Sequence, residues 1–378
     1  MKRLYQECSE FGEYNVFDTD TGVLMPVSLE EFNSLKALVD PANIFNGNSK
    51  THTFFPRRIY FQITRRCNLS CPYCFIKADQ FEKDLPEDVI MNIIPYLSKN
   101  GLMEVRLTGG EPTLLKHFQK VVESFRNHNV YVSVATNGLW SEEILNYFCS
   151  KPDLWLIVSI DGDKKAHNTL RANSYDKITN NLVKLRLQNK LIRIRLNTVL
   201  TRDNVNTMES VFVLAKRIEA ESITFIPLRP QVRDSKIRHK MLTSNEFQLS
   251  IKKMIELKQK YDINFTTTIE TIYKHEIMPD KIEDERVRKP FLAGSFPFDQ
   301  LKKLATIWQD DSRWIFFRNL DYKSSECNEC NYYRVSCTGS CPIQNLDLSI
   351  LDIKEDVAQQ LFKQLQKNGE WYCYKSFM

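Results

Sequence analysis

RIYFQITRRCNLSCPYC, residues 58–74, is the stretch from which the rest of the chain can be interpreted. Its first part, Ile59 to Ile63, is rich in β-branched and aromatic residues and predicts a strand. The loop that follows carries Cys67, Cys71 and Cys74 with the spacing C-x3-C-x2-C. Three thiolates on so short a loop can bind three irons of a four-iron cluster, and the fourth iron then stays open to a further ligand.

A zinc site is the alternative interpretation of this loop. Zinc prefers paired C-x2-C elements and four protein ligands. No histidine or further cysteine lies close by in the sequence to complete such a set. We therefore interpret Cys67, Cys71 and Cys74 as ligands of an iron–sulfur cluster.

Composition limits the classes of protein to which the chain can belong. It has 378 residues, 42% of them hydrophobic and 26% charged, which is typical of a globular protein. No apolar run is long enough to cross a membrane, and the N-terminus lacks a signal-peptide pattern, so we expect a cytoplasmic protein without a membrane partner. The net charge of +5 comes from interspersed residues and predicts no nucleic-acid partner.

The middle of the chain alternates between strand and helix patterns. Strands are expected at 59–63, 105–108, 130–135, 154–160, 192–200 and 222–227, and helices at 89–97, 114–128, 141–148, 175–188 and 206–218. Such alternation predicts βαβ units around a parallel sheet. Six repeats predict an α/β fold with a partial (βα)6 TIM-like barrel rather than a closed barrel of eight.

Three regions are expected along the chain. Residues 1–55 form an N-terminal hairpin/helix extension, with strands at 15–17 and 23–27, a helix at 28–39 capped by Ser28 and Glu31, and a linker at 40–53. Residues 56–235 form the core barrel. Residues 236–378 form a C-terminal region with a helix at 243–261, a strand at 265–269, a cysteine-rich tail and a helix at 354–367.

With these motifs in this order, residues 58–230 resemble the radical S-adenosylmethionine (radical SAM) superfamily. Gly109, Gly110 and Glu111 match its GGEP motif, and Ser159 and Asp161 lie in SIDGD, a further cofactor-facing motif. The remaining matching positions are Tyr73, Thr136, Asn137, Arg171 and Asn197. Independently of the resemblance, these residues lie at or near the C-terminal ends of predicted strands, where parallel barrels place their active sites.

The resemblance implies a role for each position. Tyr73 would lie against the adenine, Glu111 would accept from the methionine ammonium, and Arg171 would pair with the methionine carboxylate. Asn197 would lie near the ribose. A [4Fe–4S] cluster would bind S-adenosylmethionine, and its reductive cleavage would yield a 5′-deoxyadenosyl radical that takes a hydrogen atom from the substrate. The resemblance names no general acid or base.

A second group of cysteines lies near the C-terminus. Cys327, Cys330, Cys337 and Cys341 are followed by a lone Cys373. This resembles the last part of a SPASM domain, although one spacing differs by a residue and the upstream cysteines of that domain are missing. We expect one auxiliary [4Fe–4S] cluster held by Cys327, Cys330, Cys337 and Cys373, with Cys341 free or in place of Cys373; a zinc ribbon is the alternative.

These features predict a radical SAM maturase that modifies a ribosomally synthesised peptide, with or without a leader segment, by oxidative cross-linking or a related change. The N-terminal extension either captures the peptide by strand addition or caps the barrel. A flavodoxin or ferredoxin is the expected electron donor. The alternatives are oxidation of a protein Cys or Ser, as in sulfatase maturation, and a small-molecule or RNA substrate.

Overall fold

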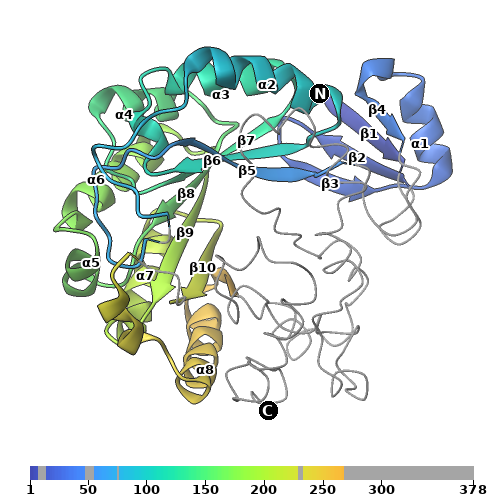
Figure 1. Cartoon of the computed structure of the whole chain (residues 1–378). Helices are drawn as coiled ribbons and strands as arrows, with labels where there is room; N and C mark the ends of the chain where they lie inside the picture. Colours follow the sequence, from blue (N-terminus) through green and yellow to red (C-terminus); the bar gives the residue numbers. More distant parts are fainter. Residues whose placement is uncertain (7–13, 47–54, 75, 229–232, 268–378) are drawn as a thin grey trace, which may run out of the picture.

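The computed structural model describes residues 1–6, 14–46, 55–74, 76–228 and 233–267. Its main element is a parallel sheet of seven strands in chain order (Figure 1). The strands are β5 (Arg58–Thr64), β6 (Glu104–Gly109), β7 (Tyr131–Thr136), β8 (Trp155–Ser159), β9 (Arg193–Leu200), β10 (Ser222–Pro227) and β11 (Asn264–Thr267). Each strand lies beside its predecessor, with β5 and β11 as the outer strands, and the sheet curves into a partial barrel (Figure 1).

Helices cover the convex side of this sheet (Figure 1). They are α2 (Glu87–Lys99), α3 (Phe118–Asn127), α4 (Glu142–Cys149), α5 (Lys164–Leu170), α6 (Tyr175–Gln188), α7 (Met208–Arg217) and α8 (Ser244–Tyr261). Short 3₁₀ helices occur at η2 (Pro41–Asn43), η3 (Pro112–Leu114), η4 (Val205–Thr207) and η5 (Ser235–Lys240).

The six expected strands and five expected barrel helices are all present, with boundaries shifted by a few residues. The expected (βα)6 count is one strand short, because β11 pairs in parallel with β10 and extends the sheet beyond residue 235. Helix α5 was not predicted from the sequence, because it has only seven residues and too few apolar positions to show a periodicity.

Side chains alternate between the two faces of each strand, and β9 shows the consequence clearly. Ile194, Leu196 and Leu200 are fully buried against the helices. Arg193, Arg195 and Asn197 point to the opposite, concave face and are only partly buried. The apolar core therefore lies between the sheet and its helices, while the concave face, here called the lumen, is lined largely by polar side chains.

The N-terminal segment forms a separate four-stranded sheet in the order β3-β2-β1-β4. It consists of β1 (Lys2–Gln6), β2 (Tyr14–Asp18), β3 (Val23–Pro26) and β4 (Ile44–Asn46), with α1 (Leu29–Lys36) packed on it. The expected hairpin is β2–β3, and the expected capping box of Ser28 and Glu31 is present. Two strands were missed: β1, and β4 within the expected linker, which pairs in parallel with β1.

This small sheet is fastened to the end of the barrel at which the parallel strands begin (Figure 1). Arg3 is buried and donates to the carbonyl oxygens of Ser98, at 2.6 Å, and Leu102, at 2.5 Å. The hydroxyl of Tyr5 donates to Gly101 O at 3.2 Å. The N-terminal extension thus packs against one end of the barrel, and an apolar cluster of Tyr5, Phe17, Phe45, Met103 and Tyr131 fills the contact.

The expected tail elements lie outside the described residues, so the helix at 354–367 and the C-terminal cysteine-rich domain are not part of the described fold. Among the residues that are described, no helix is long and apolar enough to cross a membrane.

Replacement of Arg3 by Met is expected to lower the free energy of unfolding by about 3 kcal/mol, because the buried carbonyls of Ser98 and Leu102 lose charged donors. Urea unfolding followed by circular dichroism measures the change. Lys2→Met, at an exposed position on the same strand, is the control and should change stability by less than about 0.5 kcal/mol. Equal effects of the two variants would contradict the anchoring role of Arg3.

Candidate functional site

The cysteine loop directly follows β5 and is held by backbone and side-chain contacts. Cys67 N–H donates to Asp79 O at 2.9 Å, and Cys74 N–H closes a turn onto Cys71 O at 3.1 Å. The guanidinium of Arg66 donates to Leu114 O at 2.7 Å and pairs with Asp84. The loop is thereby tied both to the segment that follows it and to the end of β6.

Gly109 and Gly110 lie directly against the start of this loop. Gly110 N–H donates to Thr64 O at 2.9 Å. A Cβ atom on Gly109 would come within 2.0 Å of Thr64 O, and one on Gly110 within 2.0 Å of Arg66 O. The missing side chains therefore allow the chain to approach its own backbone closely.

Glu111 is fully buried and joins the ends of β6 and β7. Its carboxylate accepts hydrogen bonds from Thr113 N at 3.2 Å and Thr113 Oγ1 at 2.7 Å, from Thr136 Oγ1 at 2.8 Å, and from Asn137 N at 2.7 Å. Burial raises the pKa of Glu111 above its ordinary value, and these hydrogen bonds oppose that effect. Glu111 and Thr136 therefore serve as scaffold within the described residues.

Asn137 carries this network to the cysteine loop. Its Nδ2 donates to Asn68 Oδ1 at 2.7 Å and lies 4.0 Å from the sulfur of Cys67. The backbone N–H of Leu69 also donates to that sulfur, at 3.4 Å. Two N–H donors thus approach Cys67, an arrangement suited to a negatively charged sulfur ligand.

A second buried carboxylate, Asp161, lies just beyond the end of β8. One of its oxygens accepts from the hydroxyl of Tyr73 and from Arg171 Nε, the latter at 2.6 Å. The other oxygen accepts from Val199 N at 2.8 Å. The guanidinium carbon of Arg171 lies 5.3 Å from the ring centroid of Tyr73. The expected residues Tyr73, Asp161 and Arg171 therefore meet in one cluster.

The charges in this cluster are well matched. Burial alone would lower the pKa of Arg171, but the charge of Asp161 outweighs it, so that the pKa lies above its ordinary value. Burial raises the pKa of Tyr73 well above its usual range, which keeps its hydroxyl protonated as a donor to Asp161. The cluster therefore stays ion-paired at neutral pH.

His167 is a member of this cluster that the sequence analysis missed. It is fully buried, its Nδ1 accepts from Asp161 N at 3.1 Å, and its Nε2 lies 3.0 Å from Ser174 Oγ. Burial lowers its pKa to about 4, so the ring is neutral and carries its proton on Nε2. No sequence motif included it, and only its place three residues into the unrecognised α5 could have suggested a buried role.

Several polar groups on the lumen side lack partners among the described residues. Asn197 Oδ1 is buried without a hydrogen bond. Arg171 uses only its Nε within the described part of the chain, which leaves the Nη groups of its fork available. Ser159 lies beside Asn197 in the β8–β9 pairing and is partly buried. Asn197 Oδ1 can therefore accept a hydrogen bond from a bound molecule, and the Nη groups of Arg171 can donate to a carboxylate of that molecule.

The three thiols are free and fit the expected cluster chemically. Burial raises the pKa of Cys67 to about 11 and also raises that of Cys71, so iron must displace protons from these two residues on binding. No three His, Cys, Asp or Glu side chains in the described ranges converge on a single ion. A four-iron cluster does not require that, because each thiolate binds a different iron.

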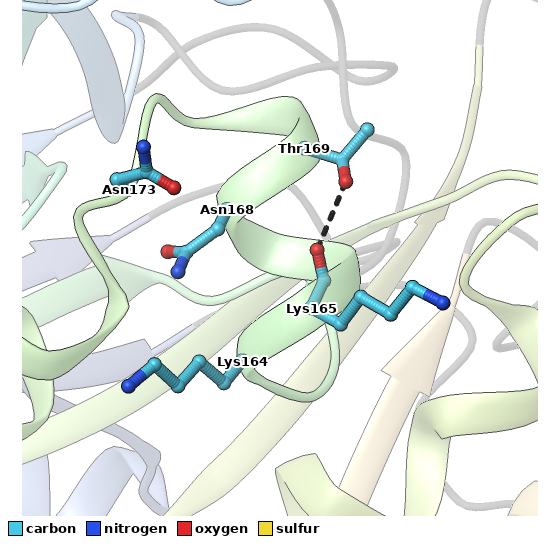
Figure 2. Close-up of a pocket in the computed structure, with 5 residues that line it drawn as sticks. All are labelled: Lys164, Lys165, Asn168, Thr169 and Asn173. Atoms are coloured by element: carbon cyan, nitrogen blue, oxygen red, sulfur yellow. Dashed lines mark hydrogen bonds between the residues drawn. The ribbon is translucent and has the colours of Figure 1, made fainter.

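A surface hollow of about 530 Å³ lies elsewhere, on the outer side of α5 (Figure 2). Lys164 is exposed and pairs with Asp176 at 2.6 Å, and Thr169 donates to Lys165 O at 3.0 Å within the same helix. Asn168 and Asn173 complete its lining. Because these side chains are exposed or already bonded locally, the hollow offers no buried chemistry of its own.

The expected ligands Cys327, Cys330, Cys337, Cys341 and Cys373 lie outside the described residues.

Comparisons with known proteins agree with this geometry. Residues 61–215 match the model described as Radical SAM superfamily. The chain is 29% identical over 121 residues to the sporulation killing factor maturation protein SkfB of Bacillus subtilis. This alignment covers 32% of this chain and 30% of SkfB. It is 33% identical over 120 residues to a cysteine-type anaerobic sulfatase-maturating enzyme of Clostridium perfringens, covering 28% and 32%. The matched stretches thus span less than a third of each relative.

A solved structure extends the likeness in fold to most of the chain. Streptococcus suis SuiB, crystallised with its precursor peptide SuiA, superimposes with a TM-score of 0.68 over 91% of this chain and 96% of SuiB. The sequence identity is 14%, so this likeness is one of fold.

Gly110→Ala is expected to displace the cysteine loop, because the added Cβ would lie 2.0 Å from Arg66 O. After anaerobic reconstitution, the variant should lose up to about four irons per chain. Gly101→Ala is the control for a destabilising glycine substitution away from the cysteine loop, because Gly101 has a positive φ of 91° and lies just after α2. It should lower stability and keep the iron. A Gly110→Ala protein with full iron content would contradict the packing argument.

His167 should make stability dependent on pH. Its pKa in the folded protein is about 4, below the unfolded value of about 6.5, so its contribution is complete above pH 6.5 and is lost as the pH falls toward 4. Iron-free protein should be about 2 kcal/mol less stable at pH 5 than at pH 7.5 on account of this residue. Urea unfolding at both pH values should show that His167→Gln lacks this difference in the free energy of unfolding between pH 5 and pH 7.5. An unchanged pH dependence in the variant would rule out the neutral buried ring.

Proposed function

We propose that this chain, a member of the radical SAM superfamily, cleaves S-adenosylmethionine reductively and uses the resulting radical to modify a ribosomally synthesised peptide by oxidative cross-linking or a related change. One observation carries the proposal: Cys67, Cys71 and Cys74 lie on a loop at the C-terminal edge of a parallel barrel, packed against Gly109 and Gly110. The strand ends around it supply unpaired polar groups on the lumen side.

The three thiolates would hold a [4Fe–4S] cluster with one iron open to S-adenosylmethionine. When bound, this group supplies the electron that breaks the sulfur–carbon bond and generates the 5′-deoxyadenosyl radical. The chain's own residues would bind and orient S-adenosylmethionine. The unpaired fork of Arg171 suits the methionine carboxylate, and the orphaned Oδ1 of Asn197 suits a ribose hydroxyl. Asn137 and Leu69 direct N–H groups at Cys67.

Tyr73 and Glu111 hold more indirect positions in this scheme. The hydroxyl of Tyr73 is bound to Asp161, which fixes the ring beside the last cysteine, where it would lie against the adenine. All hydrogen bonds of Glu111 go to its own protein neighbours, three on Oε1 and one on Oε2, so only Oε2 retains the capacity to accept from the methionine ammonium. Glu111 is therefore proposed as a ligand contact secondary to Arg171.

A peptide substrate is supported by the relatives and by the fold. SkfB is named as a maturation protein, and SuiB was crystallised with a precursor peptide. An oxidative cross-link releases an electron, which an auxiliary cluster on Cys327, Cys330, Cys337 and Cys373, or Cys341, would accept. The reducing electron would come from a flavodoxin or ferredoxin. Oxidation of a protein Cys or Ser is the second candidate, favoured by the 33% identity to a sulfatase-maturating enzyme.

Replacement of Cys67, Cys71 and Cys74 together by Ala tests the proposal. In anaerobically reconstituted protein, iron should fall from about eight to about four per chain, since each cluster holds four irons. Formation of 5′-deoxyadenosine from S-adenosylmethionine and dithionite should be abolished. Cys149→Ala, at a free cysteine on α4, is the control and should change neither result.

Other outcomes bear on separate parts of the proposal. About four irons falling to none, with zinc retained, would make the tail a zinc site and remove the auxiliary cluster. Absence of iron from the wild-type protein would overturn the proposal as a whole.

A further inference from the structure

Four arginines lie near the N-terminal ends of the strands, and three of them have carboxylate partners. Arg58 pairs with Glu104 at 2.5 Å, and Arg106 pairs with the same carboxylate at 3.2 Å. Arg193 pairs with Glu221 through two contacts of 2.8 Å and 3.0 Å, and also donates to Thr21 O in the N-terminal sheet. These three cations therefore belong to the scaffold at the end of the barrel against which the N-terminal sheet packs.

Arg195 differs from its neighbours. Within the described part of the chain it makes no hydrogen bond or ion pair, and its Nε is buried without an acceptor. Its guanidinium carbon lies 4.9 Å from the ring centroid of Trp155, whose indole Nε1 is also buried and unpaired. Two kinds of buried N–H donor, one of them charged, thus lie together without an acceptor.

The surroundings do not compensate the charge of Arg195. Cation–π attraction to Trp155 is shared with Arg106, at 5.4 Å, and Arg193, at 4.6 Å. Burial, followed by repulsion from Arg106, lowers the pKa of Arg195 to about 10. Removing part of a cation from water without a counter-ion is unfavourable. A bound anion would offset this cost, so the site is electrostatically complementary to one.

The position of Arg195 connects it to the proposed reaction space. Arg195 and Asn197 lie two residues apart on β9, so their side chains leave the same face of the sheet. Arg106, on β6, contacts both Trp155 and Tyr60 of β5, and Tyr60 is 61% exposed, so this part of the concave face is open among the described residues. A ligand on Arg195 would therefore occupy the same lumen as a substrate.

We propose that Arg195 and the indole Nε1 of Trp155 form a carboxylate-binding subsite that takes an acidic side chain of the substrate. A carboxylate matches the single charge of Arg195, and its two oxygens match a guanidinium edge, while the indole offers one further donor. The assignment of the carboxylate to a peptide rests on the proposed function; the presence of an anion site does not.

Binding of two small peptides tests the subsite directly. Reconstituted full-length protein with S-adenosylmethionine is titrated by calorimetry with N-acetyl-Gly-Glu-Gly-amide and with the matching Gln peptide. The Glu peptide should bind about tenfold more tightly, as expected for a charge-assisted hydrogen bond. Arg195→Gln should reduce this preference to less than about twofold, and Arg195→Lys should retain part of it because it keeps the charge but not the fork.

Arg202→Gln is the matched control, because Arg202 pairs with Glu246 on the exposed surface. It should leave the Glu preference unchanged. Urea unfolding of each variant checks that the fold is retained, and Arg195→Lys supplies the comparison if Arg195→Gln does not fold.

The results that would overturn the subsite are specific. They are equal binding of the two peptides by the wild-type protein, binding of neither at millimolar concentration, or a Glu preference that survives in Arg195→Gln. Competition by inorganic phosphate that is stronger than competition by acetate would replace the carboxylate by a phosphorylated ligand. None of these readouts depends on 5′-deoxyadenosine formation, so failure here is distinguishable from failure of the proposed function.

Discussion

The structure depends on the close contact between Gly109-Gly110 and the backbone of Thr64 to Arg66. Two hydrogen bonds, Gly110 N–H to Thr64 O at 2.9 Å and Glu111 N–H to Arg66 O at 2.7 Å, bring the end of β6 against the beginning of the cysteine loop. A side chain at either glycine would collide with a carbonyl oxygen. The contact fixes where Cys67 begins its loop relative to the sheet, and through Glu111 it also fixes the end of β7.

Two buried carboxylates extend this constraint around the barrel rim. Glu111 joins β6 to β7, and Asp161 joins the end of β8 to Tyr73, to Arg171 and to Val199 on β9. Polar groups buried in this way are tolerated because their hydrogen bonds are satisfied. The unpaired groups, Asn197 Oδ1 and the Arg171 fork, lie next to these rigid hubs. A binding surface supported by such a network loses little conformational freedom when a ligand arrives.

The sequence was most informative where the pattern was periodic or the spacing distinctive. The six barrel strands and their main helices followed from β-branched runs and amphipathic periodicity, and the capping box of α1 followed from Ser28 and Glu31. β4 and α5 were missed because they are short, and β1 was missed because its sequence, KRLYQ, does not alternate between apolar and polar residues. The contact of the two glycines with the backbone of the loop could not be predicted, because close backbone approach is a tertiary property. His167 and Arg195 could not be found from sequence, since what distinguishes each is its buried hydrogen-bond environment or the lack of one.

The anchoring of Arg3 has a consequence for synthesis on the ribosome. Its acceptors, Ser98 O and Leu102 O, lie 95 and 99 residues further along the chain. At translation rates of 5 to 20 residues per second, the first strand waits roughly 5 to 20 s before its docking site exists. During that interval the nascent N-terminal sheet exposes the apolar surface of Tyr5, Phe17 and Phe45. The N-terminal sheet is thus made well before the residues that cover it, and during that delay the emerging chain would benefit from a chaperone.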